Sequence, residues 1–267
     1  MNIVVIGCGT TGNAIIPLLK GVLLLIDRDI VEERNISRQK LFSKKDIGKP
    51  KAEILGKKFH CRYKIVDLDY TTVSLLDADL VIDCTDNLET RFLINEYCHK
   101  KNIPWIYTAA VGSRTRMMAF TGDACFRCLF SEVKGLETCA TAGVDPSRVE
   151  ILAKKVKEES KRIVLKKKTR GLWADDTWYT VKRNPHCSVC KGVYSYLHGK
   201  REAIIKFCGS SRYQVKGNIN FSLLKKRFHG RGEWFVHDDF YIFRDRIMVN
   251  AESEREAKKK VAEIIGS

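Results

Sequence analysis

Two C-x-x-C pairs are the residues of this 267-residue chain best suited to metal binding. Cys125 and Cys128 lie in "CFRC", and Cys187 and Cys190 lie in "CSVC". Thiolates at this spacing are common ligands of Zn²⁺, and four of them leave no coordination position open for a substrate. We therefore predict a structural zinc site that connects two distant segments. The alternative is that the pairs are redox-active and cycle between thiols and disulfides.

A glycine-rich stretch, "GCGTTG", follows the apolar run "NIVVI" near the start of the chain. Gly7, Gly9 and Gly12 have the G-x-G-x-x-G spacing, which permits a tight turn and lets phosphates approach backbone N–H groups where a helix begins. Asp27 lies eighteen residues after Gly9 and could accept a hydrogen bond from a ribose hydroxyl. These residues predict a nucleotide site, and an acid at this spacing suits either NAD or ATP.

The cations Arg38 and Lys51 favour ATP. Pyrophosphate that leaves a nucleotide carries growing negative charge, and a guanidinium can hold two of its oxygens at once. NAD requires neither cation. Asn35 and Gln39 lie beside Arg38 in the stretch "DRDIVEERNISRQ", and we count both among the candidate nucleotide-binding residues. The alternative is that Arg38 and Lys51 are ordinary surface charges.

An acidic residue, Asp86, follows the apolar run "DLVIDC" and is followed by Asn87. An ionised carboxylate at the end of a strand is well placed to hold Mg²⁺ that bridges phosphates. The alternative is that Asp86 caps the helix expected to begin near Thr90, and both roles could coexist.

Cys139 stands apart from the paired cysteines in the polar segment "LETCATAGVDP". A thiol in a loop near an activated acyl group could attack it. The alternative is a small apolar residue packed under a helix. The other cysteines are expected to be structural, because free cysteine in apolar runs behaves as a small hydrophobic residue: Cys8, Cys61, Cys84, Cys98 and Cys208.

Strands must alternate with helices to position these residues. Apolar runs predict strands within 2–7, 21–27, 63–69, 77–86 and 103–112, the fourth ending at Asp86, and helical patterns lie between them at 13–20, 50–60 and 89–102. This order predicts an α/β fold with a doubly wound, mostly parallel, Rossmann-like sheet. Ligands of such sheets bind beyond the carboxyl ends of the strands. The glycine turn, Asp27 and Asp86 are all expected at that edge.

The pattern changes after about residue 145. A charged helix at 147–164 leads through a polar, basic stretch to the second cysteine pair. Beyond residue 200 the chain predicts a small α+β module, with strands near 203–209, 233–237, 240–244 and 246–250 and helices at 220–228 and 252–266. We therefore expect one domain over residues 1–198, which carries the nucleotide and cysteine sites, and a second domain over 199–267.

The formal net charge is +16, from 48 Lys and Arg against 32 Asp and Glu. Such a balance favours anionic partners such as nucleotides, nucleic acid or acidic proteins, although it also suits a heavily charged surface without a specific partner. No stretch approaches the length of a membrane span, and the first apolar run has no basic segment before it. We expect a cytoplasmic protein without membrane contact, in a compartment that keeps thiols reduced.

Taken together, these motifs resemble the ThiF/MoeB/HesA family, the prokaryotic relatives of ubiquitin-activating enzymes. The resemblance runs from residue 2 to about 192 and rests on "GCGTTG", "IDRDIVEERNISRQKLF", "DIGKPKAE", "DLVIDCTDN", "TRFLIN", "CFRC", "TCATAGV" and "RNPHCSVC". It implies an adenylyltransferase that uses MgATP to activate a carboxylate as acyl-AMP with release of pyrophosphate. The carboxylate in this family is usually the C-terminal glycine of a ubiquitin-like sulfur carrier, and the enzyme is usually a homodimer.

The resemblance also implies roles for individual residues. The backbone around Gly9 and Thr10 would receive the phosphates, and Asp27 would hold the ribose. The remaining matches are phosphate ligands at Asn35, Arg38 and Lys51, a magnesium-linked acid at Asp86 with Asn87 beside it, an acyl- or persulfide-bearing thiol at Cys139, and zinc ligands at the four paired cysteines.

One departure concerns an arginine. Family members usually carry it on a helix before the first strand, where it reaches the ATP of the partner protomer. Here the first strand starts at Asn2, so we expect that arginine to be missing or supplied from elsewhere.

Three other interpretations remain open at this point. The substrate could be a small-molecule carboxylate in cofactor biosynthesis, or a carboxylate on a modified tRNA. The chain could instead be an NAD-dependent oxidoreductase, or a zinc-bearing binding module without catalysis.

Overall fold

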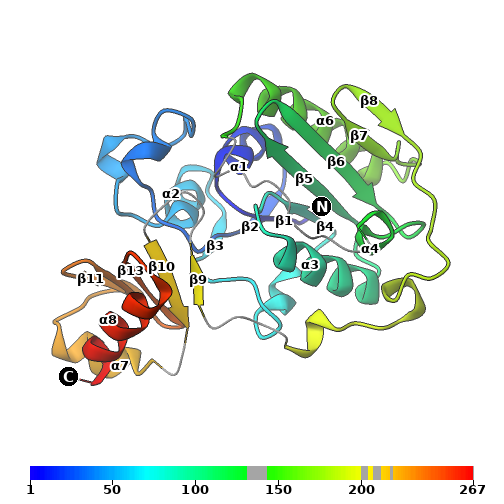
Figure 1. Ribbon diagram of the computed structural model, residues 1–267. Helices are drawn as coiled ribbons and strands as arrows, with labels where there is room; N and C mark the ends of the chain where they lie inside the picture. The colour runs from blue at the N-terminus through cyan, green and yellow to red at the C-terminus, as the bar shows by residue number, and fades with distance from the viewer. Residues whose placement is uncertain (131–142, 200–203, 207–211, 217–218, 267) are drawn as a thin grey trace. The chain divides into compact units, whose positions relative to one another are not determined.

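The computed structural model describes residues 1–130, 143–199, 204–206, 212–216 and 219–266. The chain forms two compact units, Met1–Lys200 and Arg201–Ser267, and each is considered by itself (Figure 1). Cys139 and Cys208 lie outside the described residues, so their predicted roles stay predictions.

The larger unit is built on an eight-stranded sheet with the order β3-β2-β1-β4-β5-β6-β7-β8. Strands β3, β2, β1, β4 and β5 are parallel, and β6, β7 and β8 continue the sheet in antiparallel pairs. This confirms the predicted mostly parallel α/β sheet. The strands span β1 Ile3–Ile6, β2 Val22–Ile26, β3 Arg62–Lys64, β4 Leu80–Asp83, β5 Trp105–Val111, β6 Arg114–Phe120, β7 Leu172–Ala174 and β8 Thr177–Tyr179.

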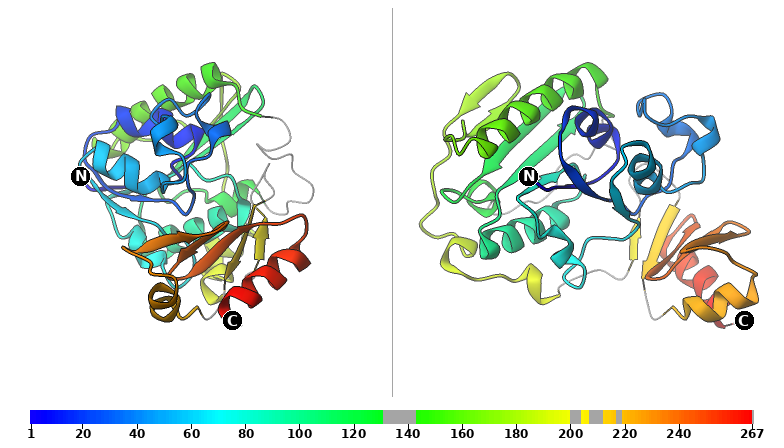
Figure 2. Two further views of the ribbon diagram at one scale, coloured as in Figure 1. Left: turned by 90° about the vertical axis from the view of Figure 1, so that its left-hand side faces the viewer. Right: turned by 180° about the vertical axis from the view of Figure 1, so that it is seen from behind.

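Helices cover both faces of this sheet, which is why its central strands are continuous apolar runs. The helices are α1 Thr10–Ile15, α2 Lys51–Lys58, α3 Leu88–Lys101, α4 Phe126–Leu129 and α6 Pro146–Val164, with 3₁₀ turns at η1 Ile16–Leu18, η2 Glu33–Asn35, η3 Lys44–Asp46, η4 Val73–Leu76, η5 Val189–Lys191 and η6 Tyr196–His198. Side chains of α1, α2 and α6 pack on one face, whereas α3 and η4 pack on the other (Figure 1 and Figure 2).

Two predicted strands of the larger unit end three or more residues earlier in the structure. The third spans Arg62–Lys64 and not residues 63–69. The fourth ends at Asp83 and not at Asp86, because the Asp83 side chain accepts hydrogen bonds from the N–H and hydroxyl of Thr85 and so turns the chain out of the sheet. Asp86 therefore lies in the loop that leads into α3.

The smaller unit contains an antiparallel five-stranded sheet with the order β11-β12-β13-β10-β9. The elements are β9 Ile204–Lys206, β10 Arg212–Lys216, α7 Phe221–Arg227, β11 Trp234–His237, β12 Phe240–Phe243, β13 Arg246–Asn250 and α8 Glu254–Gly266. Its core joins one face of the sheet to both helices, through residues such as Ile247, Leu224 and Val261. None of the described helices of the chain is both long and apolar enough to cross a membrane.

Candidate functional site

The glycine turn connects β1 to α1 at the carboxyl edge of the sheet. Gly7 has φ +93°, and a Cβ there would lie 2.5 Å from the carbonyl oxygen of Cys84. A Cβ on Gly12 would lie 2.1 Å from the carbonyl oxygen of Gly7. Both positions therefore require glycine for close backbone packing. A Cβ on Gly9 would meet nothing within 4 Å, so the backbone at Gly9 faces open space that a ligand could occupy.

Asp27 follows the last residue of β2 and fixes the glycine turn. Its Oδ2 accepts a hydrogen bond from the N–H of Cys8, and its Oδ1 accepts one from the N–H of Asp29 at 2.6 Å. Burial, with the charge of Asp29 next in importance, raises the pKa of the Asp27 carboxyl to about 6. Each carboxylate oxygen can accept more than one hydrogen bond, so Asp27 retains acceptor capacity for a ribose hydroxyl.

Lys51, the first residue of α2, is a buried cation and not a surface charge, since only 5% of the residue is exposed. Its Nζ donates to Oδ2 of Asp29 over 3.1 Å. Burial acts to lower the pKa of Lys51, but the neighbouring Asp29 and Asp27 outweigh it and raise that pKa above its usual value. Lys51 is therefore charged, and within the described residues the hydrogen bond to Asp29 uses one of its three ammonium hydrogens.

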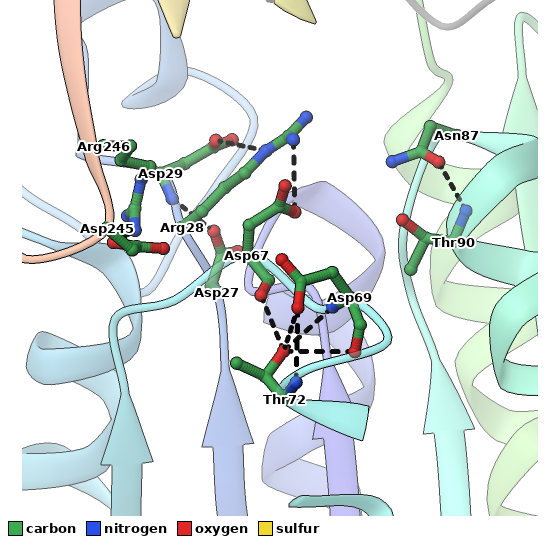
Figure 3. A network of polar contacts seen from close by, with 10 residues as sticks. All are labelled: Asp27, Arg28, Asp29, Asp67, Asp69, Thr72, Asn87, Thr90, Asp245 and Arg246. Atoms are coloured by element: carbon green, nitrogen blue, oxygen red, sulfur yellow. Dashed lines mark hydrogen bonds and ion pairs between the residues drawn. The ribbon is translucent and has the colours of Figure 1, made fainter. Parts of the chain in front are cut away.

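An ion-pair network that the sequence did not predict surrounds this lysine. Arg28 pairs with Asp67 at 3.3 Å and with Asp29 at 3.8 Å, so it joins the loop after β2 to the segment after β3 (Figure 3). Asp29 thus links two cations. The sequence contains a clue to this network in the "DRD" of residues 27–29, where two acids flank an arginine at the end of a strand.

Arg38 and Gln39 carry polar atoms that lack partners within the described part of the chain. Arg38 Nε and Gln39 Oε1 are buried and have no hydrogen bond there. Asn13, on α1, donates to the carbonyl of Cys8 and accepts from the N–H of Leu41, which connects this segment to the glycine turn. Buried polar atoms are nearly always paired, so these two atoms are the groups in this segment that still lack a partner.

Asn35 has a local structural role. Its Oδ1 accepts from the N–H of Glu32 at 2.9 Å, within the capping box of η2. This bond fixes the turn that leads to Arg38.

Asp86 is exposed in the loop between β4 and α3. The cap of α3 is Asn87, whose Oδ1 accepts from the N–H of Thr90 at 2.7 Å (Figure 3). The alternative that Asp86 caps this helix is therefore wrong. The Asp86 carboxylate is not used by the cap.

The loop that carries Asp86 is held by a buried ion pair that the sequence did not predict. Arg91, on α3, donates to Asp83 at 3.2 Å and also to the carbonyl oxygens of Thr85 and Thr108. Burial raises the pKa of Asp83 even though Arg91 opposes the shift. Arg91 thereby connects the end of β4 and the middle of β5 to the helix that follows the loop, and fixes the position of Thr85 next to Asp86.

The four paired cysteines lie together in the described structure. All their sulfurs are within 4.8 Å of one another, with Cys125–Cys187 and Cys128–Cys190 each at 3.5 Å and Cys125–Cys128 at 3.8 Å. Zn–S bonds of about 2.3 Å in a tetrahedron require sulfurs about 3.8 Å apart, so the cluster fits a tetrahedral metal ion.

The cysteine cluster and the glycine turn are at opposite edges of the sheet. The first cysteine pair follows Phe120 at the end of β6, and Phe120 pairs with Trp105 at the start of β5. The cluster therefore lies towards the amino ends of the parallel strands, away from Asp27 and the glycine turn. This position suits a structural metal and not one that acts on the nucleotide.

Comparison with known proteins agrees with this arrangement. The family model "ThiF family" matches residues 1–179. A sulfur carrier protein ThiS adenylyltransferase of Bacillus subtilis is 28% identical over 249 residues, which cover 81% of this chain and 73% of that protein. A molybdopterin-synthase adenylyltransferase of Escherichia coli is 30% identical over 219 residues, which cover 71% of this chain and 86% of that protein.

Two further matches extend the comparison. A SAMP-activating enzyme E1 of Haloferax volcanii is 33% identical over 160 residues, and the match spans 59% of that protein, less than two thirds of its length. Among solved structures, E. coli MccB with ATP superposes with a TM-score of 0.60 at 21% identity, over 71% of this chain and 67% of that chain, which supports the fold. From its motifs, its sheet and its family match, the chain belongs to the ThiF family.

Proposed function

We propose that the chain is an ATP-dependent adenylyltransferase that activates the C-terminal carboxylate of a ubiquitin-like sulfur carrier protein. The observation that carries this proposal is the buried Nε of Arg38, which has no hydrogen bond within the described residues and lies in a segment connected to the glycine turn. A guanidinium that has an unused N–H near a glycine-rich, phosphate-binding type of turn suits a polyphosphate. The names of the relatives, which include ThiS and molybdopterin-synthase adenylyltransferases, support the same activity.

The nucleotide would lie beyond the ends of β1, β2 and β4. Backbone groups at Gly9 and Thr10 would receive phosphates, since nothing blocks Gly9. Asp27 would accept hydrogen bonds from the ribose hydroxyls. The side chains that remain for the phosphates are Asn35, Arg38, Gln39 and Lys51.

The proposed reaction is an in-line displacement at phosphorus. An oxygen of the carrier's carboxylate attacks the α-phosphorus of ATP, the bond from that phosphorus to the bridging oxygen breaks, and pyrophosphate leaves with the bond's electrons. Arg38 and Lys51 stabilise the charge that develops on the leaving group. Asp86 would hold Mg²⁺, which offsets phosphate charge when it is bound. Arg91 acts indirectly, because it positions the loop that carries Asp86.

Two other groups complete the proposal. Cys125, Cys128, Cys187 and Cys190 would hold one structural Zn²⁺. After adenylation, the Cys139 thiolate would attack the acyl carbon and release AMP, which leaves a thioester. We also propose a homodimer in the cytoplasm, where reducing conditions keep these thiols free.

A second substrate deserves a parallel test because of the charge of the chain. A formal charge of +16 favours a polyanion, so a carboxylate on a modified tRNA is the second candidate. A small-molecule carboxylate would use the same chemistry.

The test is ATP–pyrophosphate exchange, measured in parallel with a sulfur carrier that ends in glycine, with small carboxylic acids and with bulk tRNA. We expect exchange that depends on the carrier and on Mg²⁺. A carrier that lacks its terminal glycine is the control. Exchange stimulated only by tRNA or by a small acid would change the substrate. No exchange with any of them, together with a thermal shift by NAD and none by MgATP, would overturn the adenylation proposal.

A further inference from the structure

A cavity of about 570 Å³ lies at the amino edge of the large sheet, away from the proposed nucleotide site. It is bordered by the last turns of α3 and α6, by the start of β5 and by the end of β6. Helices α3 and α6 lie on opposite faces of the sheet (Figure 1 and Figure 2), and both contribute residues to the cavity lining. Its volume is in the range of small-molecule sites.

The cavity contains a buried donor that has no partner in the described part of the chain. Asn95, on α3, lines it and is fully buried. Its Oδ1 accepts from the N–H of Phe126 at 2.8 Å, which fixes the orientation of the amide. Its Nδ2 is buried without a hydrogen bond. Leaving such a donor unpaired is costly, so a ligand that offers an acceptor would be favoured here.

Three lysines contribute positive charge to the lining of the same cavity. Lys166, Lys167 and Lys168 line it and are exposed. Among the described lining residues, Asp123 and Cys125, a member of the cysteine cluster, can carry negative charge. The helix ends contribute some negative potential, but three full charges exceed it. The lysine segment is held in place, because Arg162 donates through Nε to the carbonyl of Lys168 at 3.0 Å.

Part of the cavity wall is apolar. Trp105 and Phe120 stack with ring centroids 4.7 Å apart, and Ile103 and Ile163 lie beside the cavity with them. A wall that combines apolar rings with polar groups suits an organic ligand that also carries a polar group.

We propose that this cavity binds a small organic phosphate, with the apolar part of the ligand against Trp105 and Phe120 and the phosphate near Asn95 and Lys166–Lys168. A phosphate monoester offers several acceptor oxygens and carries more than one negative charge. The site is separate from the nucleotide pocket and does not depend on the proposed adenylation.

Calorimetric titration of the full chain with phenyl phosphate tests this proposal. We expect saturable binding, with the same Kd in the presence and absence of the ATP analogue AMPCPP. Inorganic phosphate and benzyl alcohol should each bind more weakly, because each offers half of the recognised chemistry. Competition by AMPCPP, or equal affinity for either half-probe, would overturn the proposal.

Variants locate the binding. Replacing Lys166, Lys167 and Lys168 together by alanine should raise the Kd about tenfold, which corresponds to about 1.4 kcal/mol, since three weak near-surface ion pairs are lost. The matched control is Lys258→Ala with Lys259→Ala, two exposed lysines of α8. Asn95→Asp keeps the acceptor for Phe126 and replaces the donor by an oxygen, so it should weaken binding further. The variant with Lys166, Lys167 and Lys168 replaced changes only exposed side chains and should fold. An unchanged Kd in that variant would overturn the proposal even if Asn95→Asp fails to fold.

Discussion

Asp27 is the residue whose environment has the clearest consequence for ligand binding. It is buried beside Asp29 and Lys51, and its pKa is raised to about 6. Two backbone N–H groups already use part of its acceptor capacity. Its protonation state therefore changes close to neutral pH, where an unperturbed aspartate would be fully ionised.

ATP affinity should consequently fall as the pH is lowered through about 6. The ionised carboxylate accepts hydrogen bonds from ribose hydroxyls better than the neutral acid does. One pH unit below the pKa, only about a tenth of the Asp27 carboxyl is ionised. We expect the Kd for ATP to rise several-fold, up to about tenfold, between pH 7 and pH 5. Adenosine, which has no phosphate to titrate, should show the same trend. Asp27→Asn should remove it, and a pH dependence retained in that variant would assign the effect to another group.

Asp86 offers a cleaner test because it is exposed and is not the helix cap. Asp86→Ala should lower carrier-dependent pyrophosphate exchange by about a hundredfold or more, as loss of a transition-state electrostatic group does. Its melting temperature should be nearly unchanged, since no core volume is lost. Asp239→Ala, at an exposed aspartate of the smaller unit, is the control. Near-normal exchange in Asp86→Ala would remove Asp86 from the proposed magnesium site.

Cys139 belongs to a later step than adenylation. A thiol takes no part in the attack on phosphorus, so Cys139→Ala should leave pyrophosphate exchange intact. The variant should no longer form a carrier adduct that thiol reagents release, measured by intact-protein mass spectrometry. Cys84 and Cys98 cannot replace it, because burial raises the pKa of both thiols far above the usual value. An adduct in the variant would show that another thiol or nucleophile carries the acyl group.

At the scale of elements, the sequence predicted best where a strand is apolar on both faces. The runs that became β1, β2, β4 and β5 each lie between two helical layers, so every residue could be apolar. Their order alone also predicts that the glycine turn and Asp27 lie at the carboxyl ends of the strands. The Cys₄ cluster followed from spacing alone, because two C-x-x-C pairs are a metal-site pattern in any fold.

The elements that were missed have weak local signals. Strands β6 and β10 carry charged or amide side chains among their apolar residues, and β7 and β8 are only three residues long. Their pairing is decided by neighbours in the sheet, as β-propensity usually is. The Asp83–Arg91 pair was missed for a similar reason. A helix at residues 89–102 was predicted, but the sequence does not say which side of it faces the end of β4.

The metal site should stabilise the junction between α4 and η5. Cys187→Ser should lower zinc content below one ion per chain and reduce the free energy of unfolding by about 3 kcal/mol or more, as loss of a structural metal does. Atomic absorption and denaturant unfolding measure the two quantities. Cys61→Ser, at a half-buried cysteine outside the cluster, should keep its zinc. Purified protein without zinc, whose paired thiols oxidise and reduce reversibly, would support the redox alternative instead.

At the scale of the whole molecule, the two edges of the sheet have separate assignments. The proposed nucleotide site is at the carboxyl edge, and the cysteine cluster and the proposed phosphate cavity are at the amino edge. The net charge of +16 adds a field that attracts polyanions without selecting among them. Any tRNA binding from that field should weaken steeply with salt, whereas recognition of a carrier's terminal carboxylate should depend on it less.

The most direct test of the account follows oxygen from the substrate to AMP. The carrier is prepared with oxygen-18 in its terminal carboxylate and incubated with enzyme, MgATP and hydroxylamine, which traps the activated acyl group. If the carboxylate attacks the α-phosphorus, mass spectrometry should find one oxygen-18 atom in the AMP and none in the pyrophosphate. AMP without the label, formed at the same rate with or without the carrier, would mean that water is the nucleophile and would contradict adenylation of the carrier.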